Sequence, residues 1–515
     1  MSVLIVNAEL ATNQLRDVLL EGGRVAWMSS PRDALSSDLS SLLDAASAQR
    51  ISSDATVIDA KGGALLPGLH DHHIHLLSLT ESLRSVSVGP QEVADVGELH
   101  LKLRSAQGKG WIRAVGYHES VAGDLTKDEL DEIVRNRPLR IQHTSGAMWM
   151  LNTLGMKLLG VSEITPGAEV DTSGKATGRL FRNDAILRRG SLDNLSESGA
   201  STDLQRTKEL DEVGNMLASF GVTGVTDATP GYGDAEVGFF RNMSDVGAIP
   251  QRLTLMPSVE TSVETTLEAS FARSTSVGKP KHRVSFGPHK IILSDHLLPD
   301  FSKLAEEVRD AHKAGRSVAV HSVTRASLAL LVAVLNEVGS LDGDRVEHAS
   351  VAPPDLVAEL QRHKLRVVVQ PHFIAERGDR YLNEVESEDL PWLYRCQGFL
   401  DAGLRVAGGT DAPFAQPNPW LAIWAAVKRE TQPGGQVIAR QERVTADQAR
   451  DLFLSPPDDP GGKPRYVHEG MVADLCLLHE PWEDVARSMP ENPVRDTWVG
   501  GQFVELGGIE PPSVK

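Results

Sequence analysis

The sequence has little cysteine, no basic excess and no long apolar run. Two cysteines, Cys396 and Cys476, are too few among 515 residues for a disulfide framework or a thiolate metal cluster. Lys and Arg number 52 against 70 Asp and Glu, a formal charge of -18, which disfavours binding to nucleic-acid phosphates. No run reaches the roughly 18 apolar residues of a membrane span, and the N-terminus lacks the pattern of a signal peptide. We therefore expect a cytoplasmic protein that binds neither nucleic acid nor membranes.

What is present is an ordinary globular composition, 41% hydrophobic and 24% charged. From Gly221 onward, β-rich runs alternate with helical segments at the spacing of βα units, about 30 residues each. The runs begin near Val222, Arg252, His289, Ser317, Arg345, Arg366 and Leu404. An eighth strand is predicted from Ala64–Leu66 into the histidine-rich segment that follows it. The pattern predicts an α/β fold, a TIM (β/α)8 barrel over residues 61–455.

Three further segments complete the predicted organisation. Residues 1–60 and 465–515 read as short strands with turns, and we expect them to form one small β domain. The first βα connection is far longer than one helix requires, so residues 76–210 are predicted to be an inserted subdomain over the C-terminal face of the barrel. A capping box at Thr445–Gln448 predicts a helix to about Leu454.

Six side chains able to bind a metal or hold a proton stand near predicted strand ends. His73 and His75 share one face of a strand because side chains alternate with period 2, which alone is weak evidence. The others come from four separate strands: Lys290, His321, His348 and Asp411. Side chains at the C-terminal strand ends converge on the mouth of a barrel. Four imidazoles and a carboxylate suit Zn²⁺ or a similar divalent ion.

At this point the sequence resembles a known family. PGLHDHHIH, residues 67–75, is similar to the Pro-Gly-x-x-Asp-x-His-x-His signature of the amidohydrolase superfamily. GPHKIILSD, RVEHAS and GGTDAP follow in order and resemble its family 3 branch, which includes N-substituted formamide deformylases. The resemblance covers nearly the whole chain. It implies a TIM barrel beside a β-sandwich built from both chain ends, and a two-metal hydrolase.

Carried over to this chain, the resemblance assigns a role to each of the six groups. His73, His75 and Asp411 would bind one metal, His321 and His348 the second, and a carboxylated Lys290 would bridge the two ions, for which zinc is expected. Two metals lower the pKa of a bridging water far below about 15.7 and so yield hydroxide at neutral pH. Asp411 would take the hydroxide proton and pass it to the departing amine. Asp71 is expected to support the site rather than to bind metal.

Candidate substrate contacts lie in the insertion and after the seventh strand. They are Tyr117, His118, His143, His372 and Arg380. Two departures from the family pattern bear on the substrate. Ala147 stands where the family usually has histidine, and His296 stands where it commonly has glycine.

The leading interpretation is hydrolysis of a non-peptide carbon-nitrogen bond in a small N-acyl or N-formyl amide. The alternatives are a cyclic imide, an ester, a deaminase of an aminopyrimidine-type ring, and a non-catalytic scaffold with the same fold. Lys290 together with His321 and His348 favours a binuclear centre over the single metal typical of deaminases. Retention of all six groups argues against the scaffold. For assembly, a homodimer is the hypothesis to test.

Overall fold

The computed structural model describes residues 2–11, 14–32, 55–90, 92–108, 110–181, 186, 199–261, 283–294 and 298–505. Its contacts divide the chain into two compact units. The first unit is Met1–His75 with Leu210–Lys515, and the second is Leu76–Glu209. Among the described helices, none combines the length and the apolar character that crossing a membrane requires.

Parallel strands form the centre of the first unit. One sheet has the order β15-β14-β13-β6, with β6 (Leu69–Ile74), β13 (Val222–Tyr232), β14 (Arg252–Pro257) and β15 (Val284–Phe286). A second runs in sequence order through β16 (His289–Ile292), β17 (Val318–Ser322), β18 (Arg345–His348), β19 (Arg366–Val369) and β20 (Arg405–Gly408). All seven predicted starts from Val222 to Leu404 fall on strands or within one residue of them. Strand β15 was not predicted.

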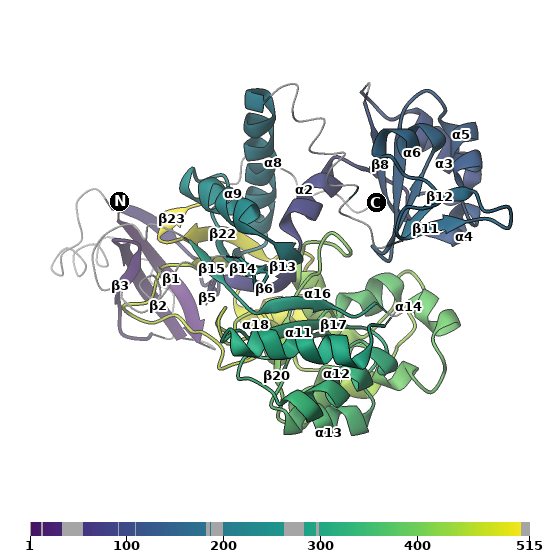
Figure 1. Ribbon diagram of the computed structural model, residues 1–515. Helices are drawn as coiled ribbons and strands as arrows, with labels where there is room; N and C mark the ends of the chain where they lie inside the picture. The colour runs from purple at the N-terminus through teal and green to yellow at the C-terminus, as the bar shows by residue number, and fades with distance from the viewer. Residues whose placement is uncertain are drawn as a thin grey trace. The chain divides into compact units, whose positions relative to one another are not determined.

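Helices follow these strands. They are α9 (Asp234–Asp245), α11 (Phe301–Lys313), α12 (Arg325–Val338), α13 (Pro354–Arg362), α14 (His372–Glu384), η2 (Leu390–Trp392), α15 (Gln397–Asp401), α16 (Pro419–Lys428), η3 (Arg440–Glu442), α17 (Ala446–Asp451) and α18 (Trp482–Ser488). Figure 1 shows α11, α12 and α13 as neighbours outside the second parallel sheet. Leu304, Val308 and Ala311 are the buried face of α11, as their spacing predicts. The capping box at Thr445 is also present.

The prediction that Ala64–Leu66 begins a barrel strand is wrong. Strand β5 (Leu65–Pro67) instead pairs with β21 (Leu475–Leu478) in a different sheet, and β6 begins only after Gly68. A Cβ at Gly68 would lie 2.1 Å from Cγ2 of Thr223, so the chain changes sheets at a residue that has no side chain. A continuous apolar sequence therefore contains two strands of different sheets.

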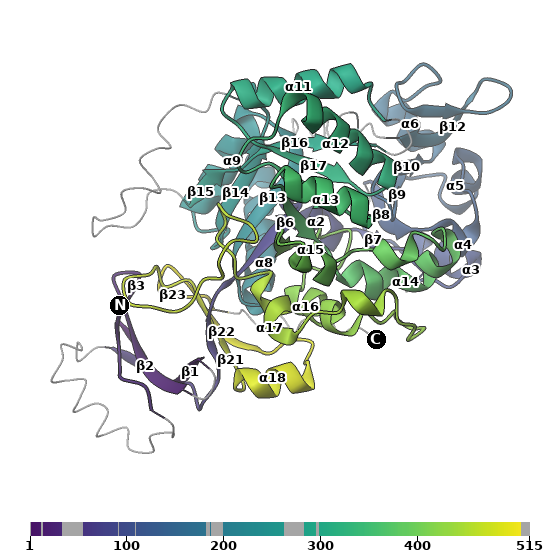
Figure 2. The same ribbon diagram turned by 90° about the horizontal axis from the view of Figure 1, so that it is seen from below.

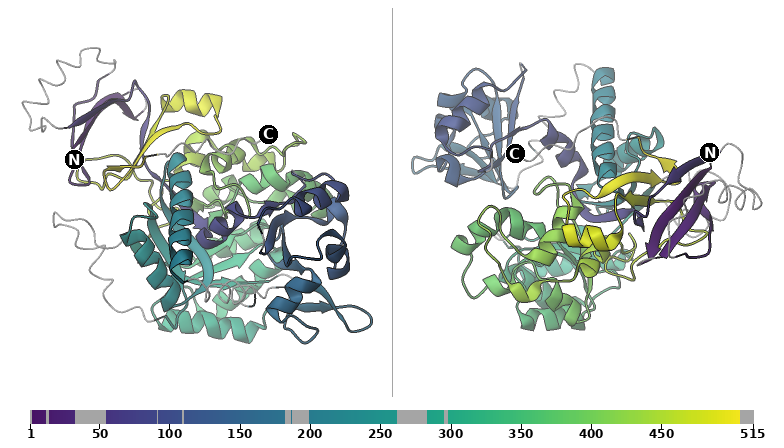
Figure 3. Two further views of the ribbon diagram at one scale, coloured as in Figure 1. Left: turned by 90° about the horizontal axis from the view of Figure 1, so that it is seen from above. Right: turned by 180° about the vertical axis from the view of Figure 1, so that it is seen from behind.

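Both ends of the chain contribute to one small β region. Its sheets have the orders β3-β2-β1-β4 and β23-β22-β21-β5. The strands not yet given are β1 (Val3–Ala11), β2 (Gln14–Glu21), β3 (Arg24–Met28), β4 (Thr56–Asp59), β22 (Val494–Val499) and β23 (Gln502–Phe503). Figures 2 and 3 show the purple first strands beside the yellow last ones. Ile5, Val18, Leu475 and Trp498 share one buried cluster, so the two ends of the chain pack against each other.

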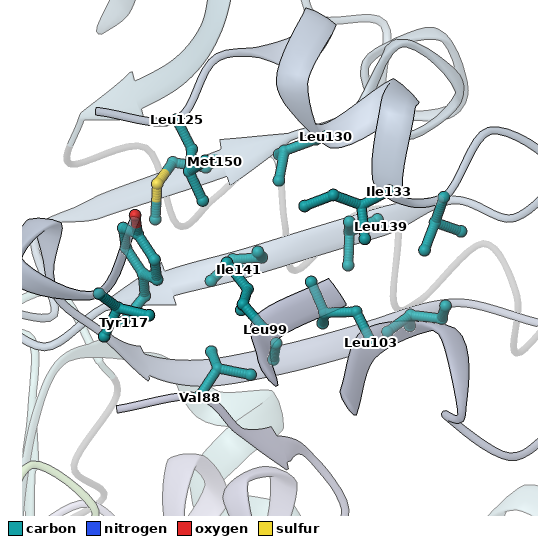
Figure 4. Packing of buried hydrophobic residues seen from close by; sticks show 14 of the residues in the cluster. Val88, Leu99, Leu103, Tyr117, Leu125, Leu130, Ile133, Leu139, Ile141 and Met150 are labelled. Atoms are coloured by element: carbon teal, nitrogen blue, oxygen red, sulfur yellow. The ribbon is translucent and has the colours of Figure 1, made fainter. Parts of the chain in front are cut away.

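The second unit has its own sheet and core. The sheet order is β11-β12-β10-β9-β8-β7. Its strands are β7 (Val86–Ser87), β8 (Ile112–Tyr117), β9 (Leu139–His143), β10 (Met148–Leu151), β11 (Ala168–Val170) and β12 (Ala176–Phe181). Its helices are α2 (Leu76–Leu83), α3 (Val96–Arg104), α4 (Glu119–Ala122), α5 (Lys127–Ile133) and α6 (Thr153–Leu159), and α8 (Gly199–Ser219) crosses the boundary between the units. Leu99, Leu130, Leu139 and Ile141 pack together in the core drawn in Figure 4.

Candidate metal centre

Three potential ligands meet where β6 and β20 end. Nε2 of His75 lies 3.1 Å and Nε2 of His73 lies 3.4 Å from Oδ1 of Asp411. One ligand atom from each of the three residues falls within 4.8 Å of the others. The amide of Asp411 donates to the carbonyl of His73 at 2.6 Å, and the amide of His75 donates to the carbonyl of Ala412. The backbone itself therefore holds the two strand ends together.

Two more histidines extend this group. The ring of His348, at the end of β18, lies 4.8 Å from the ring of His73. The ring of His321, on β17, lies 4.5 Å from that of His348. The four predicted imidazoles thus form a continuous row of ring contacts, from His75 through His73 and His348 to His321.

Hydrogen bonds at Nδ1 set the orientation of three of these rings. Nδ1 of His73 lies 2.5 Å from a carboxylate oxygen of Glu347, and Nδ1 of His348 lies 2.8 Å from Oε1 of Gln370. Because both partners are acceptors, Nδ1 carries the proton in each ring and Nε2 keeps its lone pair. Nδ1 of His75 meets the hydroxyl of Thr229 at 2.9 Å. This is the arrangement in which metal-binding histidines are commonly held.

Glu347 is a site residue that the sequence analysis missed. One carboxylate oxygen accepts the His73 bond, and the other accepts from Nε of Arg345 at 2.5 Å. Burial opposes ionisation of Glu347, but the charges of Arg345 and Lys290 and the contact with His73 together outweigh burial and hold the pKa of the carboxyl well below its usual range. The available signal was the spacing of Arg345 and Glu347, which places both on one face of the strand directly before His348.

Lys290 lies at 4% exposure on β16. Among the described residues, its Nζ has no hydrogen-bond partner. Burial lowers the pKa of the Lys290 ammonium to about 8, so a fraction of the side chain is the neutral amine at physiological pH. A buried amine without a partner is costly as it stands, and it is the form that reacts with carbon dioxide.

The protonation states in this cluster suit cation binding. Burial lowers the pKa of the His73 imidazole to about 3 and also lowers the pKa of His348, so both rings are neutral at pH 7. Burial alone would raise the pKa of Asp411, but the imidazoles of His73, His75 and His348 outweigh it and keep the carboxylate ionised. Neutral imidazoles beside a carboxylate are a donor set that fits Zn²⁺ or a similar divalent ion.

Two of the candidate ligands have a strained backbone. His348 has φ 72° and Asp411 has φ 54°, both in the left-handed region. Side chains other than glycine adopt this region at a cost of about 1 kcal/mol or more, and such residues cluster at functional sites. At His348 the left-handed backbone also interrupts the alternation of β18, so that Glu347 and His348 both reach the buried cluster.

Asp71 supports the turn that carries Asp411. Its carboxylate accepts from the hydroxyl and the amide of Thr410 and from the amide of His73. This matches the supporting role expected for Asp71. The neighbouring histidines are buried and hydrogen-bonded inside the unit, with His70 at Thr226 and His72 at Ser455.

Two predicted substrate contacts belong to α14. His372 is fully buried, and its Nε2 lies 2.9 Å from the carbonyl of Thr410. Arg380 pairs with Glu384 one turn further along the helix, with 3.4 Å between Nε and the carboxylate. The Tyr117 side chain is in the core of the second unit, and its hydroxyl donates to the carbonyl of Gly123 at 2.6 Å (Figure 4).

His118 and His143 form a separate cluster around Glu119 in the second unit. The two rings stack 5.8 Å apart, and ligand atoms of the three residues lie within 4.8 Å of one another. Each Nδ1 accepts the backbone amide of the serine two residues later, Ser120 or Ser145. The proton of each neutral ring is therefore on Nε2, which faces the Glu119 carboxylate at 3.6 and 2.9 Å. This arrangement indicates a hydrogen-bonded carboxylate rather than metal ligands.

Of the two departures from the family pattern, the structure describes one. Ala147 is buried in the second unit, and its amide donates to the hydroxyl of Ser145. His296 lies outside the described residues.

Comparison with known proteins identifies the family. The model of the amidohydrolase family matches residues 56–505. An N-substituted formamide deformylase of Arthrobacter pascens is 26% identical, with 97% of each chain covered. Two crystal structures of uncharacterized metal-dependent hydrolases have a similar fold at 20% identity: that from Pyrococcus horikoshii OT3 has a TM-score of 0.67, with 93% of this chain and 98% of that chain covered, and that from Pyrococcus furiosus has 0.65, with 93% and 99%. Because the family model matches most of its length, the chain belongs to the amidohydrolase family.

Proposed function

We propose that the chain is a metal-dependent hydrolase of a carbon-nitrogen bond other than a peptide bond, acting on a small N-acyl or N-formyl amide. The observation that carries this proposal is the convergence of His73, His75 and Asp411, with a row of ring contacts leading to His348 and His321. The relative from Arthrobacter pascens, which is named for removal of a formyl group from a substituted amide, supports this class of substrate.

The fold we propose around this site is a closed (β/α)8 barrel with a β-sandwich beside it. The two parallel sheets would be the two arcs of the barrel. Support comes from the backbone hydrogen bonds that join the ends of β6 and β20, and from the contacts of β13 with β16. The sheets shared by the two chain ends would be the layers of the sandwich.

His73, His75 and Asp411 would hold one divalent ion, and His321 and His348 would hold a second. For both ions we propose zinc, because imidazole and carboxylate are ligands that it prefers. Carbon dioxide would add to the Lys290 amine, with loss of one N–H proton to solvent, to give an anionic carbamate between the ions. Support comes from the buried Lys290 Nζ, which has no partner among the described residues. The bound ions would supply Lewis-acid activation of the water and of the amide carbonyl.

Asp411 would move the proton that the reaction requires. Water oxygen adds to the carbonyl carbon, the carbon-nitrogen bond breaks, and the products are a free acid and an amine. An amine is a poor leaving group until it is protonated, so Asp411 would accept the proton of the water and deliver it to that nitrogen. Its ionised state and its contacts with both His73 and His75 support this role.

Substrate contacts remain part of the proposal. We assign selectivity to Leu76–Glu209 with His118 and His143 as contributors, together with His372 and Arg380 after β19. The ring of His143 is partly exposed beside Glu119, which is consistent with contact to a ligand. His143→Ala should change the ratio of kcat/KM between short and bulky amides. Equal losses for unrelated amides would contradict a role in selection.

The test of function combines metal content with a substrate panel. Enzyme produced with zinc should hold about two ions per chain and release free acid from N-formyl or N-acyl amines. Preferential turnover of a cyclic imide, an ester or an aminopyrimidine would move the assignment to that class. Metal content below one ion per chain, with no turnover, would indicate a non-catalytic scaffold.

The Lys290 carbamate is tested by substitution and rescue. Lys290→Ala should lose at least one zinc and nearly all activity, and a short carboxylic acid added with zinc should restore part of both. An intact mass that shows a bare amine in fully metallated, active enzyme would refute the bridge.

A further inference from the structure

We infer that Asp227 is a positioning residue for His75, a ligand of the first proposed metal position. Asp227 acts through Thr229, whose hydroxyl meets Nδ1 of His75 at 2.9 Å. This role rests on the proposed function, because it requires an ion bound by His75. It adds a buried carboxylate that belongs neither to the proposed ligands nor to the proposed proton transfer.

Thr229 lies in an irregular segment at the end of β13. The ladder of β13 with β14 shifts register between Asp227 and Tyr232, so the residues between them are not set by that ladder. On the other side of β13, the ladder with β6 ends at the pair of Asp227 with Ile74, the residue directly before His75. Both Thr229 and His75 therefore lie beyond the last regular pair of their strands, and side chains must fix their relative position.

The carboxylate of Asp227 holds this segment at two points. Its Oδ1 accepts the amide of Thr229 at 2.9 Å, and its Oδ2 accepts the hydroxyl of Tyr232 at 3.1 Å. Tyr232 is itself fixed, because its carbonyl accepts the amide of Ser258 at 2.9 Å. Asp227 and Tyr232 are both buried. A carboxylate that accepts the amide two residues later closes a local turn, and this turn gives the Thr229 hydroxyl its position beside His75.

The position of this hydroxyl matters for the lone pair of His75. When the hydroxyl accepts the Nδ1 proton, Nε2 keeps its lone pair on the side of Asp411, whose Oδ1 lies 3.1 Å away. Partners that orient a ligand in this way contribute to metal binding although they do not touch the ion. Asp227 therefore supports the first ion at one remove, through Thr229 and then His75.

The charge of Asp227 has to be separated from its hydrogen bonds. Burial is the main influence on the pKa of Lys290, and the charge of Asp227 acts on the same ammonium in the opposite direction. Asparagine removes this charge but keeps an oxygen that can accept the Thr229 amide, whereas alanine removes both. Asp227→Asn should therefore retain most of the zinc that the wild-type protein holds, and Asp227→Ala should not.

The experiment measures zinc loss against chelator concentration in matched variants. Thr229→Val removes the hydroxyl and should shift one step of the loss curve to about 10- to 100-fold lower chelator, the usual effect of losing such a partner. Thr229→Ser keeps a hydroxyl and should restore most of the retention. Asp227→Ala should act like Thr229→Val, and the two together should add little, because both remove one support.

Thr497→Val is the matched control. Thr497 is also buried, and its hydroxyl donates to the carbonyl of Ala218 at 2.7 Å, so the variant also loses a hydroxyl hydrogen bond. It should leave the loss curve unchanged. If Asp227→Ala does not fold, Tyr232→Phe takes its place, because it removes one of the two contacts of the carboxylate and should shift the same step in the same direction.

The outcomes distinguish this role from the proposed function. Wild-type protein without zinc would refute the proposed function. If the wild-type protein binds zinc, an unchanged curve for Thr229→Val would refute the positioning role alone, as would equal shifts for Thr229→Ser and Thr229→Val. Asp227→Asn that loses as much zinc as Asp227→Ala would also refute it, because the charge rather than the hydrogen bond would then be responsible.

Discussion

At the scale of single residues, one ring nitrogen distinguishes the two histidine clusters of the chain. Carboxylate and amide oxygens accept from Nδ1 of His73 and His348, whereas backbone amides donate to Nδ1 of His118 and His143. The first pair presents lone pairs at Nε2, and the second presents N–H groups. Residue type and proximity are alike in both clusters, and the partners of Nδ1 are what distinguishes them.

Asp411→Asn should lower kcat by about 10²- to 10⁴-fold, the usual contribution of general acid-base catalysis. Asparagine also tolerates the left-handed backbone found at this position, so the fold should be retained. Steady-state kinetics, metal analysis and thermal unfolding of the same preparation check this. Complete loss of metal would make Asp411 chiefly a ligand, and near-normal turnover would remove it from the proposed mechanism.

His372 should make the metal-free protein sensitive to acid. Burial lowers the pKa of its imidazole to about 4, from an ordinary value of about 6.5. Between these values the unfolded chain binds a proton that the folded chain does not, so the free energy of unfolding falls as the pH decreases. His372→Asn removes this titration and should reduce the loss between pH 7 and pH 4 by on the order of 1–3 kcal/mol. Urea unfolding at both pH values measures it, and an unchanged loss would contradict it.

Residue patterns predicted the side chains of the candidate metal centre but not the side chains that hold them in place. His73, His75, His321, His348 and Asp411 were selected because each stands near the end of a predicted strand, where the side chains of a barrel would converge. Glu347 was missed because a regular strand would direct it away from the side of its neighbour His348. The left-handed backbone of His348 cancels that alternation. No sequence pattern identifies a histidine that adopts this backbone conformation.

At the scale of secondary structure, the close approach of β20 to β6 depends on glycine. A Cβ at Gly409 would lie 2.5 Å from Cβ of His73 and 2.7 Å from its backbone nitrogen. Gly409→Ala should therefore separate the strand ends, with a cost of about 1–3 kcal/mol in unfolding free energy and weaker metal retention. Chemical denaturation and metal analysis measure the two effects.

Gly238 provides the control, because alanine there should raise the free energy of unfolding instead of lowering it. It is exposed in the middle of α9, and no atom of the described residues lies within 4 Å of the point that an alanine Cβ would occupy. Alanine there should stabilise the protein by up to about 1 kcal/mol, because it is the better helix former. Equal effects of the two substitutions would show that the close contact at His73 is unimportant.

Helices and strand starts of the first unit were predictable, but the allocation of strands to sheets was not. The buried face of α11 follows from its helical period, and the capping box at Thr445 from its side chains. In the sequence, strands β5 and β6 look like one continuous strand because both are buried. A buried strand lacks the alternation of apolar and polar residues that marks a strand with one exposed face. Their separation at Gly68 depends on the contact with Thr223, which is distant in sequence.

At the scale of the whole molecule, the second unit should open independently of the first. Leu130 is fully buried in the core of that unit, so Leu130→Ala should cost about 2–5 kcal/mol there. Hydrogen exchange should accelerate in β8, β9 and β10 and remain unchanged in β17, β18 and β19. Leu101→Ala is the control, because Leu101 is 72% exposed on α3. Equal acceleration in both units would show that they unfold together.

The β region shared by the two chain ends has a consequence for synthesis on the ribosome. Cys476 lies against the carbonyl of Pro67 although the two are 409 positions apart, and the cluster around Ile5 is closed by Trp498. The first strands therefore wait until roughly 400 further residues have been translated, which at about 5–20 residues per second takes tens of seconds. Throughout that time the nascent chain carries an uncovered apolar face, the kind of surface that chaperones bind. The N-terminal strands of this region are thus synthesised long before the strands that cover them.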